Sequence, residues 1–351
     1  MWNFKRQTLL FICSAILIIP IGVNLSCTAG DCQEEDLHCQ VRHIAEPYIF
    51  DYVSWEAEAI SSLIGNKLSG QDEMAPEAEL RRQIEIVLGE NDINVFPPLN
   101  FNLEQPPHLL VLSPRERIMY QDRVLIRQEI SIEEMEALEK QIDELGLSSL
   151  VESLGGFGAT YPPMVTDNAS LTFTINAVVE EWLHQYLAFR PLGFRYLIDS
   201  IGIRQDPDVI VLNETLAGMV SEEIGSVVYH RYYDGKDKMT DDQNIPDFDF
   251  DAEMRETRRN VDIYLSQGEI EVAEDYMESR RQLFVQHGYN IRKLNQAYFA
   301  FHGIYGSDPA SVSPINEDLK LLRTQSPTLQ EFLNRTSAMT GYEDLKEALK
   351  E

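Results

Sequence analysis

Two short stretches of the chain carry acidic residues and a histidine at a spacing that suits a metal ion. Residues 178–186 read Val-Val-Glu-Glu-Trp-Leu-His-Gln-Tyr and contain Glu180, Glu181 and His184. Residues four apart in a helix share a face, so Glu180 and His184 can contact one ion while Glu181 lies beside it. A catalytic zinc ion takes three protein ligands, imidazole nitrogen or carboxylate oxygen, and keeps one open position. Glu214 supplies the third ligand, and Glu181 is then placed to act as general base on a water molecule.

These motifs resemble those of the gluzincin zinc metallopeptidases, a class that includes predicted bacterial aminopeptidases. The gluzincin helix carries His-Glu-x-x-His, and its second motif, Asn-Glu-Gly-Phe-Ala, is similar to Asn-Glu-Thr-Leu-Ala at residues 213–217. The resemblance implies a zincin-like fold, a peptide or protein substrate, and zinc held by His184 and Glu214 with Glu181 as the base. The chain departs from the pattern at the first ligand, where Glu180 replaces a histidine. A carboxylate there adds negative charge and favours harder metal ions.

Two other interpretations of the same residues stay open. The first is a non-catalytic pseudopeptidase that binds a partner in the cell envelope, with His184 as a hydrogen-bonded core histidine. The second is a carboxylate-rich iron site, which usually needs two Glu-x-x-His helices. The only other such spacing joins Glu35 to His38, near the N-terminus. A hydrolase differs from the inactive scaffold in binding a metal ion and in losing activity when Glu181 becomes Gln.

Several other residues are weaker candidates for chemistry. Residues 155–163, Gly-Gly-Phe-Gly-Ala-Thr-Tyr-Pro-Pro, are too rich in Gly and Pro for a helix. We expect an extended segment there, either a plain loop or an edge strand that pairs with a peptide substrate, as in gluzincins. Tyr298, His302 and Tyr305 share one predicted helix, and one of them could hydrogen-bond a tetrahedral intermediate. Core or surface packing is the simpler role for these three and for His230.

The rest of the sequence predicts a mostly helical α+β protein: a zincin-like catalytic domain with a small N-terminal sheet and a C-terminal helical region. Apolar periodicity predicts helices at residues 44–64, 77–88, 131–145, 170–189, 213–232, 251–287, 290–304, 315–322 and 328–348. Strands are expected at 108–112 and 123–128. Ser131 and Glu134 form a capping box, and Gly146 ends that helix.

The N-terminal residues indicate export from the cytoplasm. Lys5 and Arg6 precede an apolar run, which is the layout of a signal peptide or a retained signal-anchor helix. Cys27 follows Leu-Ser in a partial match to a lipoprotein processing site, so lipidation and a retained transmembrane helix are both open. Cys32 and Cys39 flank a short acidic segment, where either a local disulfide or two free thiols would fit an oxidising space.

Composition limits the partners of the chain. It has 351 residues, 44% of them hydrophobic, and a net charge of −29 from 29 basic and 58 acidic residues. Such an acidic surface repels nucleic acid, which is excluded as a partner. The acidic residues 241–251 lack the regular spacing of an EF-hand and predict a solvated loop rather than a calcium site.

The sequence therefore predicts a membrane-anchored, extracytoplasmic, zinc-dependent metallopeptidase. The predicted organisation is a signal peptide or membrane anchor at 1–27, a juxtamembrane segment at 28–43, the zincin-like domain at 44–250, and the C-terminal helical region, packed on it, at 251–351. The run Lys-Leu-Asn-Gln-Ala-Tyr at 293–298 is also similar to the C-terminal part of predicted bacterial aminopeptidases.

Overall fold

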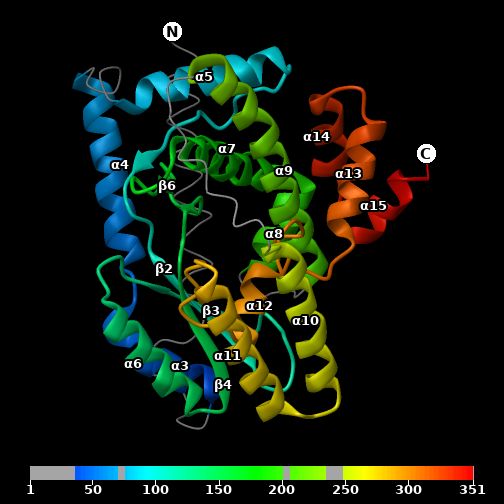
Figure 1. Ribbon diagram of the computed structural model, residues 1–351. Helices are drawn as coiled ribbons and strands as arrows, with labels where there is room; N and C mark the ends of the chain where they lie inside the picture. The colour runs from blue at the N-terminus through cyan, green and yellow to red at the C-terminus, as the bar shows by residue number, and fades with distance from the viewer. Residues whose placement is uncertain (1–35, 70–75, 201–205, 235–247, 351) are drawn as a thin grey trace.

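The structure, a computed structural model, describes residues 36–69, 76–200, 206–234 and 248–350. It confirms a mixed α+β protein that is mostly helical and has two small sheets (Figure 1). No helix within these ranges is both long enough and apolar enough to cross a bilayer. The predicted signal or anchor segment, with Cys27, lies outside the described residues.

The larger sheet has three antiparallel strands. The central strand β2 (His108–Pro114) pairs with β3 (Asp122–Ile126) on one side and with β4 (Leu147–Ser153) on the other. Strands β2 and β3 were both predicted, and β4 was not. The sequence of β4, Leu-Ser-Ser-Leu-Val-Glu-Ser, has no strict apolar alternation, and Ser148 and Ser149 are buried together with its leucines.

Helices cover both faces of this sheet. Alternate residues of a strand point to opposite faces, and Leu110 faces a core shared with α3 (Leu37–Ala45) and α6 (Ile132–Asp143). Leu109 faces the other way, into a core shared with α12 (Gln296–His302). The sheet is therefore a middle layer, with α3 and α6 on one face and α12 on the other.

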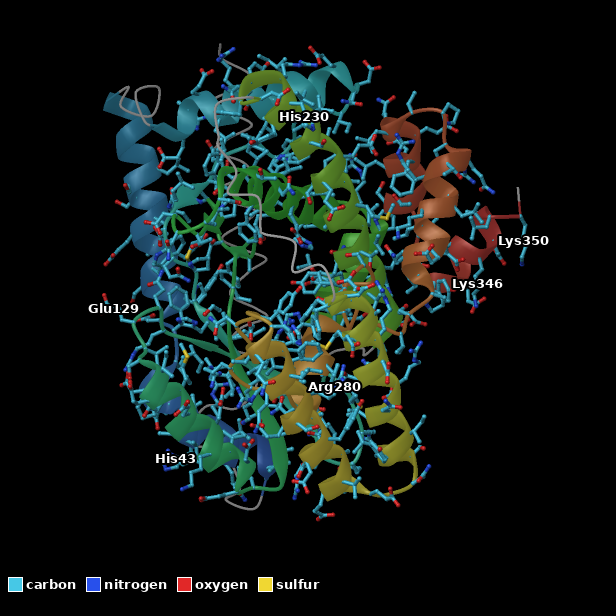
Figure 2. The ribbon with its side chains drawn as sticks, in the orientation of Figure 1. His43, Glu129, His230, Arg280, Lys346 and Lys350 are labelled. Carbon is cyan, nitrogen blue, oxygen red and sulfur yellow. The ribbon has the colours of Figure 1, made fainter. Side chains whose placement is uncertain are left out.

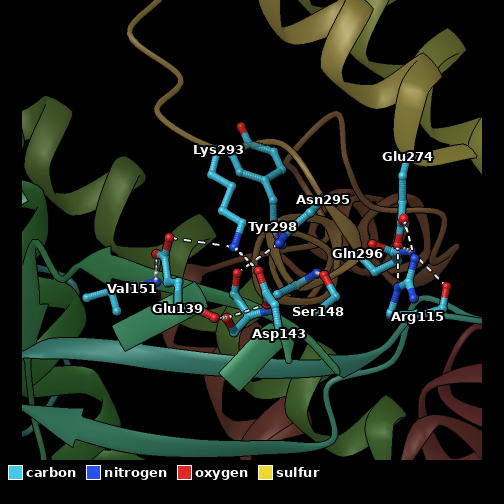
Figure 3. A network of polar contacts seen from close by, with 12 residues as sticks. Arg115, Glu139, Asp143, Ser148, Val151, Glu274, Lys293, Asn295, Gln296 and Tyr298 are labelled. Atoms are coloured by element: carbon cyan, nitrogen blue, oxygen red, sulfur yellow. Dashed lines mark hydrogen bonds and ion pairs between the residues drawn. The ribbon is translucent and has the colours of Figure 1, made fainter. Parts of the chain in front are cut away.

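A polar network fixes the segment before α12 to the sheet layer (Figure 3). Lys293 Nζ donates to Asp143 Oδ2 at 2.8 Å and lies 3.6 Å from a carboxylate oxygen of Glu139. Asn295 Nδ2 donates to the Ser149 carbonyl at 2.8 Å. Lys293 and Asn295 belong to the run at 293–298, which the sequence indicated only by its similarity to aminopeptidases. In the structure they anchor this part of the chain to the sheet.

The second sheet is small and lies next to the main helices. Strand β1 (Asn102–Leu103) pairs in parallel with β6 (Met164–Val165), and β6 pairs antiparallel with β5 (Gly156–Phe157). The order is β1-β6-β5, so β5 is an edge strand. This confirms that the glycine-rich segment begins in an extended conformation.

A helical core forms the rest of the molecule. Trp182 lies at its centre, 1% exposed, and its indole N–H donates to the Pro97 carbonyl at 2.8 Å. Figure 1 shows the three C-terminal helices beside α9. The helices that contribute to this core are α5 (Pro76–Glu90), α7 (Leu171–Ala188), α8 (Pro191–Ser200), α9 (Pro207–Tyr232), α13 (Ile315–Gln325), α14 (Leu329–Ser337) and α15 (Tyr342–Ala348).

Several predicted helices are interrupted. The one expected at 44–64 is wrong at its start: α3 ends at Ala45, a 3-10 turn covers Glu46–Tyr48, and α4 (Tyr52–Ser69) follows. Pro47 in that turn has no N–H to continue a helix. Asp51 then caps α4 by accepting from the Ser54 N–H at 3.1 Å.

Three of the predicted C-terminal helices are divided or shorter in the structure, whereas the one expected at 315–322 extends to Gln325. The helix expected at 251–287 is two helices, α10 (Phe250–Ser266) and α11 (Ile270–Gln286), because Gly268 adopts φ +77° between them. The one expected at 290–304 shrinks to α12, and the one expected at 328–348 divides into α14 and α15.

Candidate metal centre

Helices α7 and α9 carry the two motifs and run antiparallel. Ser170 caps α7 by accepting from the Phe173 N–H. Helix α9 starts at Pro207 rather than at the predicted Asn213, since proline suits the first helical turn. The helices pack so closely that a Cβ added to Gly225 of α9 would lie 1.9 Å from Asn176 Oδ1 of α7. That contact joins the early part of α7 to the late part of α9. Because the two helices are antiparallel, the late part of α7 lies against the early part of α9.

The predicted ligands meet at that crossing. Glu180, His184 and Glu214 each offer one ligand atom, and these atoms lie within 4.8 Å of one another. His184 Nε2 is 3.4 Å from Glu214 Oε2. Within the described ranges, no other group of three His, Cys, Asp or Glu side chains is so arranged. The group could hold a metal ion, with one imidazole nitrogen and two carboxylate oxygens as donors.

Two neighbouring side chains orient these ligands. Asn213 Oδ1 lies 2.9 Å from His184 Nδ1, and an amide oxygen can only accept, so Nδ1 carries the proton and Nε2 faces Glu214. Tyr196 of α8 donates its hydroxyl to Glu214 Oε1 at 2.7 Å and stacks its ring on His184 with centroids 5.9 Å apart. Such contacts fix the direction of metal ligands and tune their basicity.

Burial changes the ionisation of the acidic residues on α7. It raises the pKa of Glu180 to about 7, against the opposing effect of His184. It also raises the pKa of Glu181, which is 9% exposed, to about 8. Both carboxyls are therefore poised to exchange protons near neutral pH.

The pKa values of His184 and Glu214 shift so that both side chains stay charged. Burial acts to lower the pKa of His184, but the adjacent Glu214 carboxylate raises it to about 10. Burial acts to raise the pKa of Glu214, but His184 and the hydrogen bond from Tyr196 hold it below its ordinary value. The two side chains form a buried ion pair.

The glycine-rich segment lies directly against Glu181. A Cβ on Gly156 would be 2.1 Å from Glu181 Oε1, and a Cβ on Gly158 would be 2.5 Å from Oε2. A side chain at either position would have to displace the Glu181 carboxylate, so the two glycines permit this close approach. The segment was predicted from composition alone, whereas its contact with Glu181 is a structural finding.

The weaker candidates Tyr298, His302 and Tyr305 differ in their position relative to the candidate metal ligands. Burial raises the pKa of Tyr305 well above its ordinary value, and the charges of Glu214 and Glu180 act in the same direction, so its phenol lies within electrostatic range of the candidate ligands. His302 Nδ1 lies 3.2 Å from Asp308 Oδ2, and the Tyr298 ring packs 4.1 Å from the imidazole. Only Tyr305 among these three residues is in electrostatic range of the ligands.

His230 is not part of the centre. It is exposed at the far end of α9 (Figure 2), roughly 24 Å from Glu214 at 1.5 Å per residue. His38 pairs with Asp122 at 2.5 Å and joins no metal group, which gives no support to an iron site with two histidines. Most of the acidic loop at 241–251 lies outside the described residues, and Asp249 caps α10.

Tyr196 contacts two of the predicted ligands, Glu214 and His184, but was not predicted from the sequence. The sequence predicts a turn at Pro191 and Gly193, but Pro191 starts α8 and Gly193 lets that helix approach Leu187, where a Cβ would lie 2.1 Å from the carbonyl oxygen. A proline at the first helical position was the available signal. Comparison of the chain with protein-family models, with curated proteins and with solved structures found no match.

Proposed function

We propose that this protein is a zinc-dependent metallopeptidase in which Glu180, His184 and Glu214 hold the ion and Glu181 is the general base. The observation that carries the proposal is the convergence of three ligand atoms within 4.8 Å, next to a buried fourth side chain, Glu181. The resemblance of the two motifs to those of gluzincins supports the same assignment, together with a zincin-like domain at 44–250.

The donor set fits a divalent metal ion. Zinc accepts His nitrogen and carboxylate oxygen, and Asn213 and Tyr196 already hold His184 and Glu214 in place from outside. A bound zinc ion would act as a Lewis acid on the peptide carbonyl and would make water acidic enough to lose a proton near neutral pH.

Glu181 would move the proton. Burial raises the pKa of Glu181 to about 8 without a metal ion, and the positive charge of a bound ion would favour the carboxylate form, which accepts a proton. It would take the proton of the attacking water and give it to the leaving nitrogen as the peptide bond breaks. The glycines at 156 and 158 would limit its movement during both transfers.

The edge strand beside Glu181 supports a peptide as substrate. Strand β5 pairs only with β6 among the strands that the structure describes, so its other edge has no strand partner and could pair with an extended chain. Cys39 is disulfide-bonded, which supports an oxidising, extracytoplasmic location. Its predicted partner Cys32 lies outside the described ranges.

The test is metal content and peptidase activity of the purified full-length chain. We expect about one zinc ion per chain by elemental mass spectrometry, in line with a single three-ligand site, and none in His184→Ala. Glu181→Gln should keep the metal and lose hydrolysis. His230→Ala, which changes an exposed histidine on the same helix pair, is the matched control. A parent protein that binds no zinc after incubation and dialysis would overturn the proposal.

A non-catalytic binding protein is the second candidate. The observation that favours it is the His184–Glu214 ion pair at 3.4 Å, which satisfies both buried charges within the protein. This function predicts that a strong chelator leaves the melting temperature unchanged, whereas the metallopeptidase should lose stability as its ion is removed.

A further inference from the structure

The backbone that follows strand β5 is held by hydrogen bonds from helix α7. Gln185 lies one turn beyond Glu181, and its Nε2 donates to the Gly158 carbonyl at 3.2 Å and to the Thr160 carbonyl at 2.8 Å. Gln185 is 8% exposed. The helix that carries Glu181 therefore also binds the segment that covers Glu181.

Helix α4 holds the same backbone from another side. The Tyr52 hydroxyl donates to the Ala159 carbonyl at 2.9 Å. The Tyr161 N–H donates to both carboxylate oxygens of Glu56, at 3.2 and 3.3 Å. Four successive residues, 158–161, thus have backbone polar groups bonded to side chains of α7 and α4.

The residues on α4 are buried, although they serve a loop. Tyr52 is 4% exposed and Glu56 is 9% exposed. Loop backbone usually bonds to water at the surface, and a buried carboxylate without a basic partner is costly. No ion pair joins Glu56 to a basic side chain within the described part of the chain. Its carboxylate serves the Tyr161 amide instead.

We propose that Tyr52 and Glu56 are positioning residues for Glu181, which act by pressing the glycine segment against its carboxylate. Fixing residues 159–161 leaves Gly156 and Gly158 no room to withdraw, and their backbone then defines where the Glu181 carboxylate can lie. The inference rests on the proposed function, in which Glu181 is the general base. Helix α4, which is far from α7 in the sequence, then also contributes residues that position Glu181.

The test compares four variants of the full-length chain. Glu56→Leu removes the acceptor, Glu56→Gln keeps an oxygen acceptor of similar shape, and Tyr52→Phe removes a single hydroxyl. Glu58→Gln, on the exposed face of the same helix, is the matched control. Labelling of Glu181 by a carbodiimide with an amine, measured by mass spectrometry, reports whether its carboxylate is covered without any need for activity.

We expect Glu56→Leu and Tyr52→Phe to increase labelling of Glu181, while Glu56→Gln and Glu58→Gln match the parent. In peptide hydrolysis, kcat should fall by about 10- to 100-fold in Glu56→Leu with KM little changed, because a misplacement of about 1 Å is enough for such a loss. Rescue by Glu56→Gln would distinguish positioning from general destabilisation.

Unchanged labelling in both Tyr52→Phe and Glu56→Leu would overturn the inference, and so would equal labelling in Glu56→Leu and Glu56→Gln. If Glu56→Leu fails to fold, Tyr52→Phe decides the question alone. A parent that hydrolyses no peptide would overturn the proposed function, while the labelling result would still decide whether α4 positions Glu181.

Discussion

The Nδ1 atom of His184 lies 2.9 Å from the Oδ1 atom of Asn213, the residue immediately before Glu214. One turn of α9 therefore supplies a candidate metal ligand and also sets the direction of the imidazole on α7. In the proposed centre, the Asn-Glu pair of the second motif would work as a unit, with Glu214 as a ligand of the metal ion and Asn213 as the residue that orients the histidine.

Replacing Asn213 should weaken metal binding. In Asn213→Ala the imidazole of His184 loses the acceptor that fixes its Nδ1 proton, and zinc affinity should fall by about 10- to 100-fold. Competition with a chromophoric chelator measures the change. Asn91→Ala, which alters a distant helix end, is the control. Equal affinities in the parent and Asn213→Ala would show that Asn213 does not orient the ligand.

Restoring the common first ligand should change metal preference. Glu180→His removes one carboxylate and completes His-Glu-x-x-His, so affinity for zinc should rise relative to affinity for manganese. Parallel titrations of both ions in parent and variant give the ratio. If the ratio is the same in both proteins, Glu180 is not a ligand.

An added methyl group at Gly156 should disturb the site. The Cβ would lie 2.1 Å from Glu181 Oε1, so Gly156→Ala must displace a buried side chain. The free energy of unfolding in urea should fall by about 1–3 kcal/mol. Gly89→Ala on α5, where a Cβ meets nothing within 4 Å, should instead be neutral or stabilising. Equal behaviour of the two variants would contradict the close approach.

Glu56 should make stability depend on pH. Burial raises its pKa from 4.5 to about 7 in the folded protein, so the folded state holds its proton more tightly than the unfolded chain. Its contribution to stability is present below pH 4.5 and is lost as pH rises through about 7. The unfolding free energy of Glu56→Gln relative to the parent should therefore increase by about 3 kcal/mol across this range.

Urea unfolding of both proteins at several pH values measures that difference. Other carboxyls with raised pKa values, such as Glu180 and Glu181, are present in both proteins, so their contributions cancel. A difference that does not change with pH would mean that Glu56 titrates normally in the folded state.

Local signals in the sequence predicted part of the fold. The capping box of Ser131 and Glu134 is present, and Gly146 ends that helix region at φ +85°. Strand β4 escaped prediction because its serines find buried hydrogen bonds, such as Ser149 Oγ with Asp143 Oδ1 at 2.7 Å. Only the folded chain provides those partners.

The candidate centre, too, could be predicted from local sequence only in part. Helical spacing predicts that Glu180 and His184 share a face, and the three predicted ligands do meet. The roles of Tyr196, Tyr52 and Glu56 depend on helices that pack from distant parts of the chain, and periodicity carries no information about such packing. Composition predicted the extended glycine segment, but not the carboxylate that it covers.

The centre also has an order of assembly. The Gly306 N–H donates to Thr215 Oγ1 at 2.9 Å, next to Glu214 in the chain, and the Tyr305 phenol lies within electrostatic range of the candidate ligands. Residues 305 and 306 follow α12, and the residues just before α12, Lys293 and Asn295, hydrogen-bond to the sheet layer. During synthesis the chain therefore exposes an incomplete centre until residues beyond 306 have left the ribosome. A metal ion bound at the proposed centre before then would lack the enclosure that this segment provides.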